Sequence, residues 1–266
     1  MSDIVPTGSR AKARLLGISR STLWYRKKRP EKDWVLKVRI EEVLREFPAY
    51  GHRRLALHLK ENKKKVRRVM RLFGIKPYRR RTRGWKKPRK LAAIYPNLLM
   101  QIVPSYPHHV WTADFTHLAW KNKDIRIATT MDVYTRRIVG LAIGTRGGTV
   151  LATAALGNAL LTYPRPLFFH SDNGVEYEAR SFRALLAEFG ILISRSKKGC
   201  PWENGYQESF YDKFKVEFGD PSRFETLGEL VAEIYAAVHR HNTERIHSAL
   251  RMSPAVFAAA HASAIL

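Results

Sequence analysis

The chain has 266 residues, of which 45% are hydrophobic, and this is enough for one or two domains with a packed core. It contains no apolar run of about 18 residues and begins without an apolar signal segment, so we expect a cytoplasmic protein with no membrane contact. The only cysteine, Cys200, excludes an intrachain disulfide and a zinc site built from several cysteines, and it favours a reducing compartment.

The positive charge of the chain is large and unevenly distributed. The formal net charge is +25, and residues 1–100 hold 30 of the 48 Lys and Arg residues but only 7 of the 23 Asp and Glu residues. Such an excess repels itself unless an anion shares it. We therefore predict double-stranded DNA as the partner. Acidic membrane lipid is the weaker alternative, because the basic segments carry no lipid-inserting face.

Residues 1–32 are predicted to form a helix-turn-helix-like segment. Gly17 marks the turn, and Ser19 or Ser21 is suited to cap the second helix. That helix would present Arg20 to a groove of DNA, as a recognition helix does. A plain helical hairpin would show the same pattern, so both interpretations stay open.

Residues 33–77 are predicted to form a small helical DNA-binding domain. Apolar residues recur at helical spacing in three successive segments, and Gly74 with Pro77 ends the last of them. Positive side chains surround the second and third helices, and the predicted DNA contacts among them are Arg53, Arg54, Lys63, Lys64, Lys65, Arg67 and Arg68. Residues 78–103 follow as a basic linker that can track a phosphate backbone.

Residues 104–220 have the pattern of an α/β core. Three strands rich in aromatic and β-branched residues follow one another closely, and two more strands alternate with helices. The predicted strands cover 109–120, 124–135, 137–145, 166–172 and 191–196, and the predicted helices cover 148–163, 178–190, 203–217 and 226–242. This order predicts a five-stranded mixed sheet with helices on both faces, and residues 221–266 would form a helical extension of this core.

Two aspartates stand where the predicted sheet meets solvent. Asp114 lies in the middle of a strand, where an ionised group is costly unless it is paired or bound to a cation. Asp172 ends the apolar strand "PLFFHSD", and strand ends are favoured positions for sites in α/β sheets. Carboxylates in such positions suit Mg²⁺, and phosphodiester chemistry commonly uses two ions about 4 Å apart.

The stretch "GCPWENGYQES" supplies a third candidate. Glu203 and Glu208 are separated by about 140° around a helix, so they cannot share a face. Glu203 at the helix start suits the helix dipole. Glu208 lies one turn beyond Asn204 and in line with Lys215, so Glu208 is the predicted chemical group.

Asp114, Asp172 and Glu208, with 57 and then 35 residues between them, resemble the DDE pattern of retroviral-integrase-like transposases. The words "VWTADFT", "FHSDNGVEY" and "NGYQESFYDKFKVE" carry this resemblance. The tail "HNTERIHSALRMSPAVF" is similar to that of the OrfB transposases of the IS-three family of bacterial insertion sequences, and the helical segments before the core also resemble theirs.

The resemblance implies an RNase H-like fold and polynucleotidyl transfer with two Mg²⁺ ions, for which Mn²⁺ could substitute. Asp114, Asp172 and Glu208 would be the catalytic metal ligands. Lys215 would contact DNA near the cut, and Asn204 would line the same site.

The function implied is that of a bacterial DNA transposase, which hydrolyses phosphodiesters at insertion-sequence ends and transfers the freed strand. It would work as a homo-oligomer on terminal repeats and target DNA, associated with the nucleoid, alone or with an upstream-frame protein or fusion. Two alternatives remain open: an RNase H-like nuclease that cuts without joining, and a domesticated DNA-binding regulator.

Overall fold

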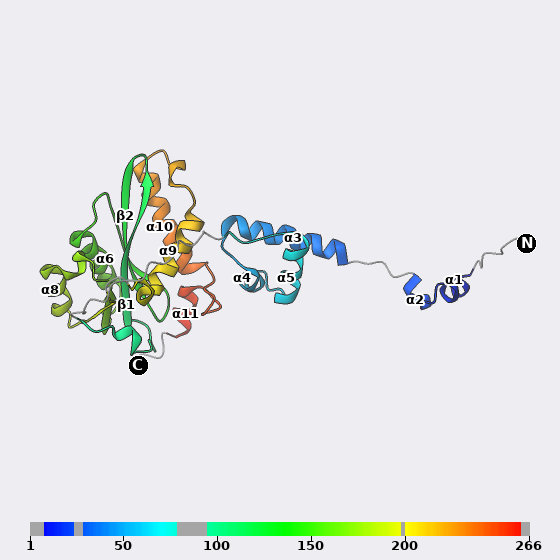
Figure 1. The fold of residues 1–266 in the computed structure, drawn as a ribbon, viewed down its shortest axis with the longest axis horizontal. Helices are drawn as coiled ribbons and strands as arrows, with labels where there is room; N and C mark the ends of the chain where they lie inside the picture. The colour runs from blue at the N-terminus through cyan, green and yellow to red at the C-terminus, as the bar shows by residue number, and fades with distance from the viewer. Residues whose placement is uncertain (1–7, 24–28, 79–94, 198–199, 262–266) are drawn as a thin grey trace, which may run out of the picture.

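The computed structural model describes residues 8–23, 29–78, 95–197 and 200–261, and Figure 1 shows their arrangement. Most of the predicted basic linker, residues 79–94, lies outside the described residues. Among the helices of the described ranges, none is both long and apolar enough to cross a membrane.

A five-stranded mixed sheet forms the centre of the larger unit. The strands are β1 (Val110–Trp120), β2 (Lys123–Asp132), β3 (Ile138–Gly144), β4 (Phe168–Ser171) and β5 (Leu192–Arg195), in the spatial order β3-β2-β1-β4-β5. β2 runs antiparallel to both β1 and β3, whereas β4 is parallel to both β1 and β5. The predicted five-stranded mixed sheet is therefore confirmed.

Helices cover both faces of this sheet. One face carries α6 (Thr149–Thr162), α7 (Val175–Glu178) and α8 (Arg180–Glu188), and the other carries α9 (Gly205–Phe218) and α10 (Leu227–Thr243) (Figure 1). Side chains alternate along β1, so that Trp111 and Ala113 pack with α6 and α8 while Leu118 and Trp120 pack with α9 and α10. The central strand is thus enclosed on both sides.

A separate core holds the preceding helices together. α3 (Arg29–Glu46), α4 (His52–His58) and α5 (Lys63–Leu72) pack around Leu36, Ile40, Leu55 and Val66. α5 begins at a cap where the Asn62 side chain accepts a hydrogen bond from the Lys64 amide, and this cap closes a short turn after α4. Near the N-terminus, α1 (Ser9–Leu15) and the four-residue α2 (Arg20–Leu23) flank Gly17, whose φ of 63° requires the left-handed region.

The helical unit contacts the larger unit through the segment between α10 and α11 (Pro254–Ala260). The Tyr50 hydroxyl accepts a 2.6 Å hydrogen bond from the Ile246 amide, and Arg54 Nε donates to Ser248 Oγ at 2.8 Å. The Arg245 guanidinium also lies 5.8 Å from the centre of the Tyr50 ring. A fully buried tyrosine therefore joins the two units.

This junction gives a stability prediction. Tyr50→Phe keeps the ring that stacks on Phe47 but removes the acceptor of the Ile246 amide, which should cost about 1–2 kcal/mol of unfolding free energy. Urea denaturation of the full chain would measure the loss. Tyr78→Phe, at an exposed tyrosine of the same unit, is the control and should change the midpoint little. Equal midpoints for the two variants would contradict the role of the hydroxyl.

Candidate active site

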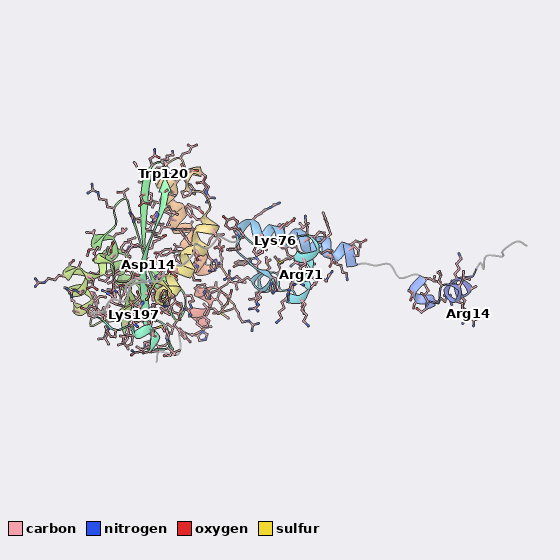
Figure 2. The ribbon with its side chains drawn as sticks, viewed as in Figure 1. Arg14, Arg71, Lys76, Asp114, Trp120 and Lys197 are labelled. Carbon is pink, nitrogen blue, oxygen red and sulfur yellow. The ribbon has the colours of Figure 1, made fainter. Side chains whose placement is uncertain are left out.

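Asp114 lies on the face of β1 that meets α9. It alternates with Ala113, which faces α6, and it stands opposite Thr129 in the antiparallel pair of β1 and β2. Asp114 Oδ1 accepts a 2.8 Å hydrogen bond from the Phe115 amide. Figure 2 shows the residue in the middle of the sheet, where a half-buried carboxylate has little access to water.

Asp172 comes level with Asp114 because of the strand register. β1 and β4 are parallel neighbours, and Thr112 pairs with His170. Extending this register by two residues places Asp172 beside Asp114, and neighbouring strands lie about 4.8 Å apart. Two carboxylates therefore emerge side by side where β4 ends.

A tight turn holds the Asp172 carboxylate. Its Oδ1 accepts a hydrogen bond from the Gly174 amide at 3.0 Å. A Cβ atom at position 174 would lie 3.0 Å from that oxygen and 2.6 Å from Oε2 of Glu176, so only glycine fits without displacing an acid. The turn thus brings the backbone close to the carboxylate that the site needs.

Arg195 stabilises the same turn through buried hydrogen bonds. Its fully buried guanidinium donates to Ser171 Oγ and to the Tyr177 carbonyl oxygen, the latter at 2.7 Å, and it pairs with Glu178 at 3.1 Å. These bonds tie the end of β4 to α7. Sequence reasoning missed Arg195, although an arginine at the end of a short apolar strand was a visible signal.

Glu208 is brought over Asp114 by the docking of α9 on β1. The Tyr211 hydroxyl donates to the Asp114 carbonyl oxygen at 2.7 Å, and Gln207 Nε2 donates to the Thr112 carbonyl oxygen at 2.7 Å. Thr129 Oγ1 donates to Gln207 Oε1 at 3.0 Å. These buried bonds fix the rotation of α9, so that Glu208 next to Gln207 stays exposed.

The three acids and Lys215 share one electrostatic environment. Burial raises the pKa of Asp114 to about 7; the Phe115 amide lowers it, the charges of Asp172 and Glu208 raise it, and Lys215 lowers it. Burial, followed by the charge of Asp212, also raises the pKa of Glu208. The charges of Asp172 and Glu208 therefore oppose ionisation of Asp114, as expected where carboxylates lie near one another.

The donors form an open site and not a closed cage. In the parts of the chain that the structure describes, no three His, Cys, Asp or Glu side chains lie close enough together to enclose a metal ion. Mg²⁺ commonly uses one or two carboxylates and completes its shell with water and phosphate oxygens. Asp114 and Asp172, with Glu208 across from them, fit such an open set of hard oxygen donors.

Asn204 has a different environment from the one predicted. Its side chain is only 3% exposed, and Nδ2 donates to the Ala113 carbonyl oxygen at 3.2 Å. Residues Pro201–Asn204 form a 3-10 turn, and α9 begins only at Gly205, so Asn204 does not stack beneath Glu208 as an α-helix would require. An enclosed side chain of this kind lacks the exposure that the predicted DNA contact requires.

The predicted basic DNA contacts other than Lys215 fall into two groups. Arg20, Arg53, Lys63, Lys64 and Arg67 are exposed. The other three are engaged within the protein: Arg54 with Ser248, Lys65 with Glu61 at 2.9 Å, and Arg68 with both oxygens of the buried Asp33. The structure therefore leaves the first group better placed to meet phosphates.

Three of these exposed residues, together with the exposed Arg71, form a basic patch near His52, which we define as Arg53, Lys63, Arg67 and Arg71. Burial lowers the pKa of His52, and the charges of these four residues lower it further. Figure 2 shows Arg71 and Lys76 on this helical unit, away from the sheet. The patch combines four cations around one imidazole.

Glu203 and His170, both near the acids in sequence, have internal partners. Glu203 Oε2 accepts hydrogen bonds from Asn97 Nδ2 and from the Lys197 amide, both at 2.7 Å. His170 is fully buried, and its Nδ1 lies 2.8 Å from Ser194 Oγ. Burial lowers the pKa of His170 to about 4, so the ring is neutral at pH 7. Both side chains hold strands and turns in place.

Comparison with known proteins identifies the family of this chain. The chain matches the integrase core domain family over residues 104–201 and again over residues 189–254. It is 32% identical to the transposase for insertion sequence element IS904 of Lactococcus lactis, over 84% of this chain and 94% of that protein. It is also 32% identical to a 31 kDa protein of insertion element IS600 from Shigella sonnei, over 86% of this chain and 89% of that protein.

A solved structure shares the fold. A chain of the simian T-cell lymphotropic virus intasome, in complex with PP2A regulatory subunit B56 gamma, matches with a TM-score of 0.52 at 18% identity. The match covers 81% of this chain and 73% of that chain. With the strand order described above, this likeness confirms the predicted RNase H-like fold.

The raised pKa of Asp114 gives a pH-dependent prediction. Between the usual value of 3.8 and about 7, the folded protein keeps a proton that the unfolded chain has released, so stability falls as pH rises through this window. Asp114→Asn should therefore raise the unfolding free energy of the metal-free chain at pH 8, by an amount on the order of a few kcal/mol, and less at pH 5. Urea denaturation in a chelator would measure both values.

The control for this experiment is Asp124→Asn, at a surface aspartate of β2 whose partner is Arg126. Its effect should be small and similar at the two pH values. An effect of Asp114→Asn that is equal at pH 5 and pH 8 would contradict the burial of an ionisable Asp114.

Proposed function

Because the chain belongs to the insertion-sequence transposases with an integrase core, we propose that it is a DNA transposase that cuts and rejoins phosphodiesters at the ends of its element. The observation that carries this proposal is the convergence of the three acids. Asp114 and Asp172 come level on neighbouring strands, and the charge of Glu208 acts on Asp114 from α9. A binding protein has no need to concentrate carboxylates where a DNA phosphate must approach.

Each acid has a distinct part in the proposed chemistry. Asp114 and Asp172 form one side of the site, on rigid strands, and Glu208 closes it from α9. A divalent cation held there, Mg²⁺ or Mn²⁺, would offset charge on the attacked phosphate and lower the pKa of the attacking water or hydroxyl. Hydrolysis at the element end would free a 3′-hydroxyl, which then attacks a second phosphodiester in line.

Lys215 is proposed to contact the DNA backbone beside the cut. It lies on α9 two turns after Glu208, and its charge lowers the pKa of Asp114. A cation in this position attracts a phosphate to the acids and reduces their mutual repulsion. The acids and Lys215 together define a site that is negative at its centre and positive at its edge.

The helical unit is proposed to bind the duplex through the basic patch. Terminal repeats and target DNA would be the partners, and residues 33–77 would form the domain that carries this surface. A homo-oligomer on DNA would supply one active site for each of two element ends. An upstream-frame protein or fusion remains a further possible partner, and the setting would be the bacterial cytoplasm.

The first functional test separates the two glutamates of "GCPWENGYQES". Glu208→Gln should reduce joining of pre-cut element ends to target DNA by roughly 100-fold or more, since it removes a carboxylate that would help to hold the divalent cation. Glu203→Gln is the matched control and should keep most activity, because its partners Asn97 and Lys197 lie within the protein. Equal joining by wild type and Glu208→Gln would remove Glu208 from the site.

The same assay distinguishes the alternative function. Product that is cut but never joined by the wild-type chain would favour an RNase H-like nuclease over a transposase. A chain that binds DNA without cutting or joining it would favour a regulator.

The second test addresses the basic patch. The double variant Lys63→Gln/Arg67→Gln should weaken duplex binding and flatten the plot of log affinity against log salt by about 1–2 units. Fluorescence anisotropy at several salt concentrations would measure the slope. Arg146→Gln/Arg180→Gln removes the same charge from exposed positions of the larger unit and is the control. A slope that both double variants leave unchanged would exclude the patch from the interface.

A further inference from the structure

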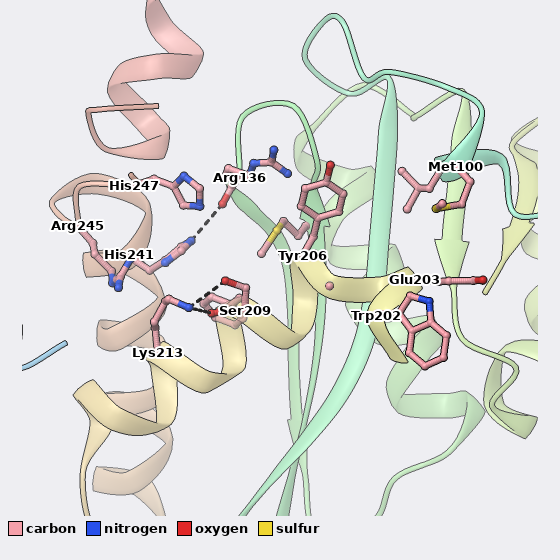
Figure 3. A pocket seen from close by; sticks show the side chains of 14 residues that line it. Met100, Arg136, Trp202, Glu203, Tyr206, Ser209, Lys213, His241, Arg245 and His247 are labelled. Carbon is pink, nitrogen blue, oxygen red and sulfur yellow. Dashed lines mark hydrogen bonds between the residues drawn. The ribbon is translucent and has the colours of Figure 1, made fainter. Parts of the chain in front are cut away.

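A pocket of about 450 Å³ lies beside α9 (Figure 3). α9 contributes Tyr206, Ser209 and Lys213, which are about 100–160° around the helix from Glu208. The pocket and the acids are therefore separated by roughly one helix diameter, about 10 Å. None of the functions proposed above uses this pocket.

Three cations line the pocket, with Arg245 and Lys213 at one end and Arg136 between its two ends (Figure 3). Arg245 is only 2% exposed; its Nε bonds to both oxygens of Glu217, and its enclosed Nη2 has no partner among the described residues. Nε and Nη1 of Arg136 are likewise enclosed and unpartnered within the described ranges. Lys213 Nζ donates to Ser209, to its carbonyl oxygen at 3.0 Å and its Oγ at 2.9 Å. Enclosed cations are costly, and an anion in the pocket would offset their charge.

The cations also repel one another. Burial lowers the pKa of His247 to about 4, and the charges of Arg136, Arg245, Arg54 and Lys213 lower it further. The pKa of Lys213 is lowered by burial and then by Arg245 and Arg54. The carboxylates Asp212 and Glu217 raise it only in part. A bound anion would offset this repulsion and add hydrogen bonds that are assisted by charge.

The other end of the pocket is lined by aromatic and apolar side chains and by Glu203, whose carboxylate is held by Asn97 and by the Lys197 amide. Trp202 is 45% exposed. The Arg136 guanidinium lies 4.1 Å from the centre of the Tyr206 ring. Figure 3 shows Trp202 and Met100 at the end opposite Arg245 and His247, with Arg136 above Tyr206 between them. Flat aromatic faces beside cations are the combination that binds single-stranded nucleic acid through base stacking and phosphate contacts.

We propose that this pocket binds one unpaired nucleotide of a DNA strand. Its phosphate would meet Arg136, Arg245 and Lys213, and its base would lie against Trp202. A pocket of this size falls within the range of small-molecule sites and suits one nucleotide. The choice of DNA as the polymer rests on the proposed function, whereas the pocket itself requires only that a strand be bound.

The position of the pocket gives the nucleotide a role. α9 presents Glu208 on one side and the pocket on the other, so a strand that reaches the acids passes close to both. Holding one unpaired nucleotide across the helix would keep the strand ends apart and fix the reacting phosphodiester over the acids.

Photocrosslinking tests this proposal without any chemistry at the acids. The full chain, in a chelator, is irradiated with a single-stranded oligonucleotide that carries 5-iodouracil, and trypsin then releases the peptide 199–213, which contains both Trp202 and Tyr206. We expect the crosslink at one of these two residues. Arg136→Gln should reduce its yield at least ~5-fold. Lys213→Gln should also reduce it and leaves the turn after β2 unchanged; trypsin then releases the peptide 199–215 in place of 199–213.

Arg180→Gln, on α8 across the sheet, is the control and should stay within about 2-fold of wild type. A fully paired duplex of the same sequence should crosslink less. Crosslinks outside the peptide, or yields unchanged in both pocket variants, would overturn the proposal. The proposal would also be overturned if free thymidine monophosphate suppressed the crosslink at the same concentration as unlabelled strand, because the pocket would then bind a small molecule.

Two comparisons separate this proposal from the proposed function. Glu208→Gln should crosslink like wild type although it does not join DNA. A wild-type chain that crosslinks at Trp202 or Tyr206 but never joins ends would refute only the transposase, and one that joins ends without this crosslink would refute only the pocket.

Discussion

The hydrogen bonds between α9 and β1 are the constraint on which the site depends. Most of the contact between this helix and the sheet is apolar, and apolar packing alone allows a helix to rotate or slide at little cost. Gln207 and Tyr211 bind backbone carbonyls of Thr112 and Asp114, and a buried bond of this kind is costly to leave unmade. The helix therefore has one favoured rotation, in which Glu208 is exposed and its charge acts on Asp114.

The same fixed rotation gives α9 two functional sides. Three acids gather on one side, where burial and mutual repulsion hold the pKa of Asp114 near 7. Enclosed cations gather on the other side, around Arg136 and Arg245. The acids, which attract a cation, and the pocket, which attracts an anion, thus lie on different sides of the same helix. A DNA strand would bring its phosphate to the pocket and its counterions to the acids.

The segment after α10 links this arrangement to the helical unit. Arg245 borders the pocket, Ile246 donates to Tyr50, and Ser248 accepts from Arg54. The segment 245–248 therefore both borders the pocket and contacts the helical unit. Duplex bound at the basic patch would be held at a defined position relative to α9, which is the geometry that transfer between two DNA segments requires.

Local patterns in the sequence determined much of this protein. Period-two alternation and apolar runs predicted all five strands, and the cost of burying a lone carboxylate singled out Asp114 before any contact was known. The division of residues 1–103 into domains and a linker stays a prediction.

Only the tertiary structure decided which polar side chains are exposed and which are engaged within the protein. A 3-10 turn ends the helical spacing that had placed Asn204 beneath Glu208. Arg54 and Arg68 meet partners 194 and 35 residues away, and Arg136 and Arg245 approach each other across a pocket. Hydrogen bonding and burial depend on distances in space, and the chain fixes those distances only when it is packed.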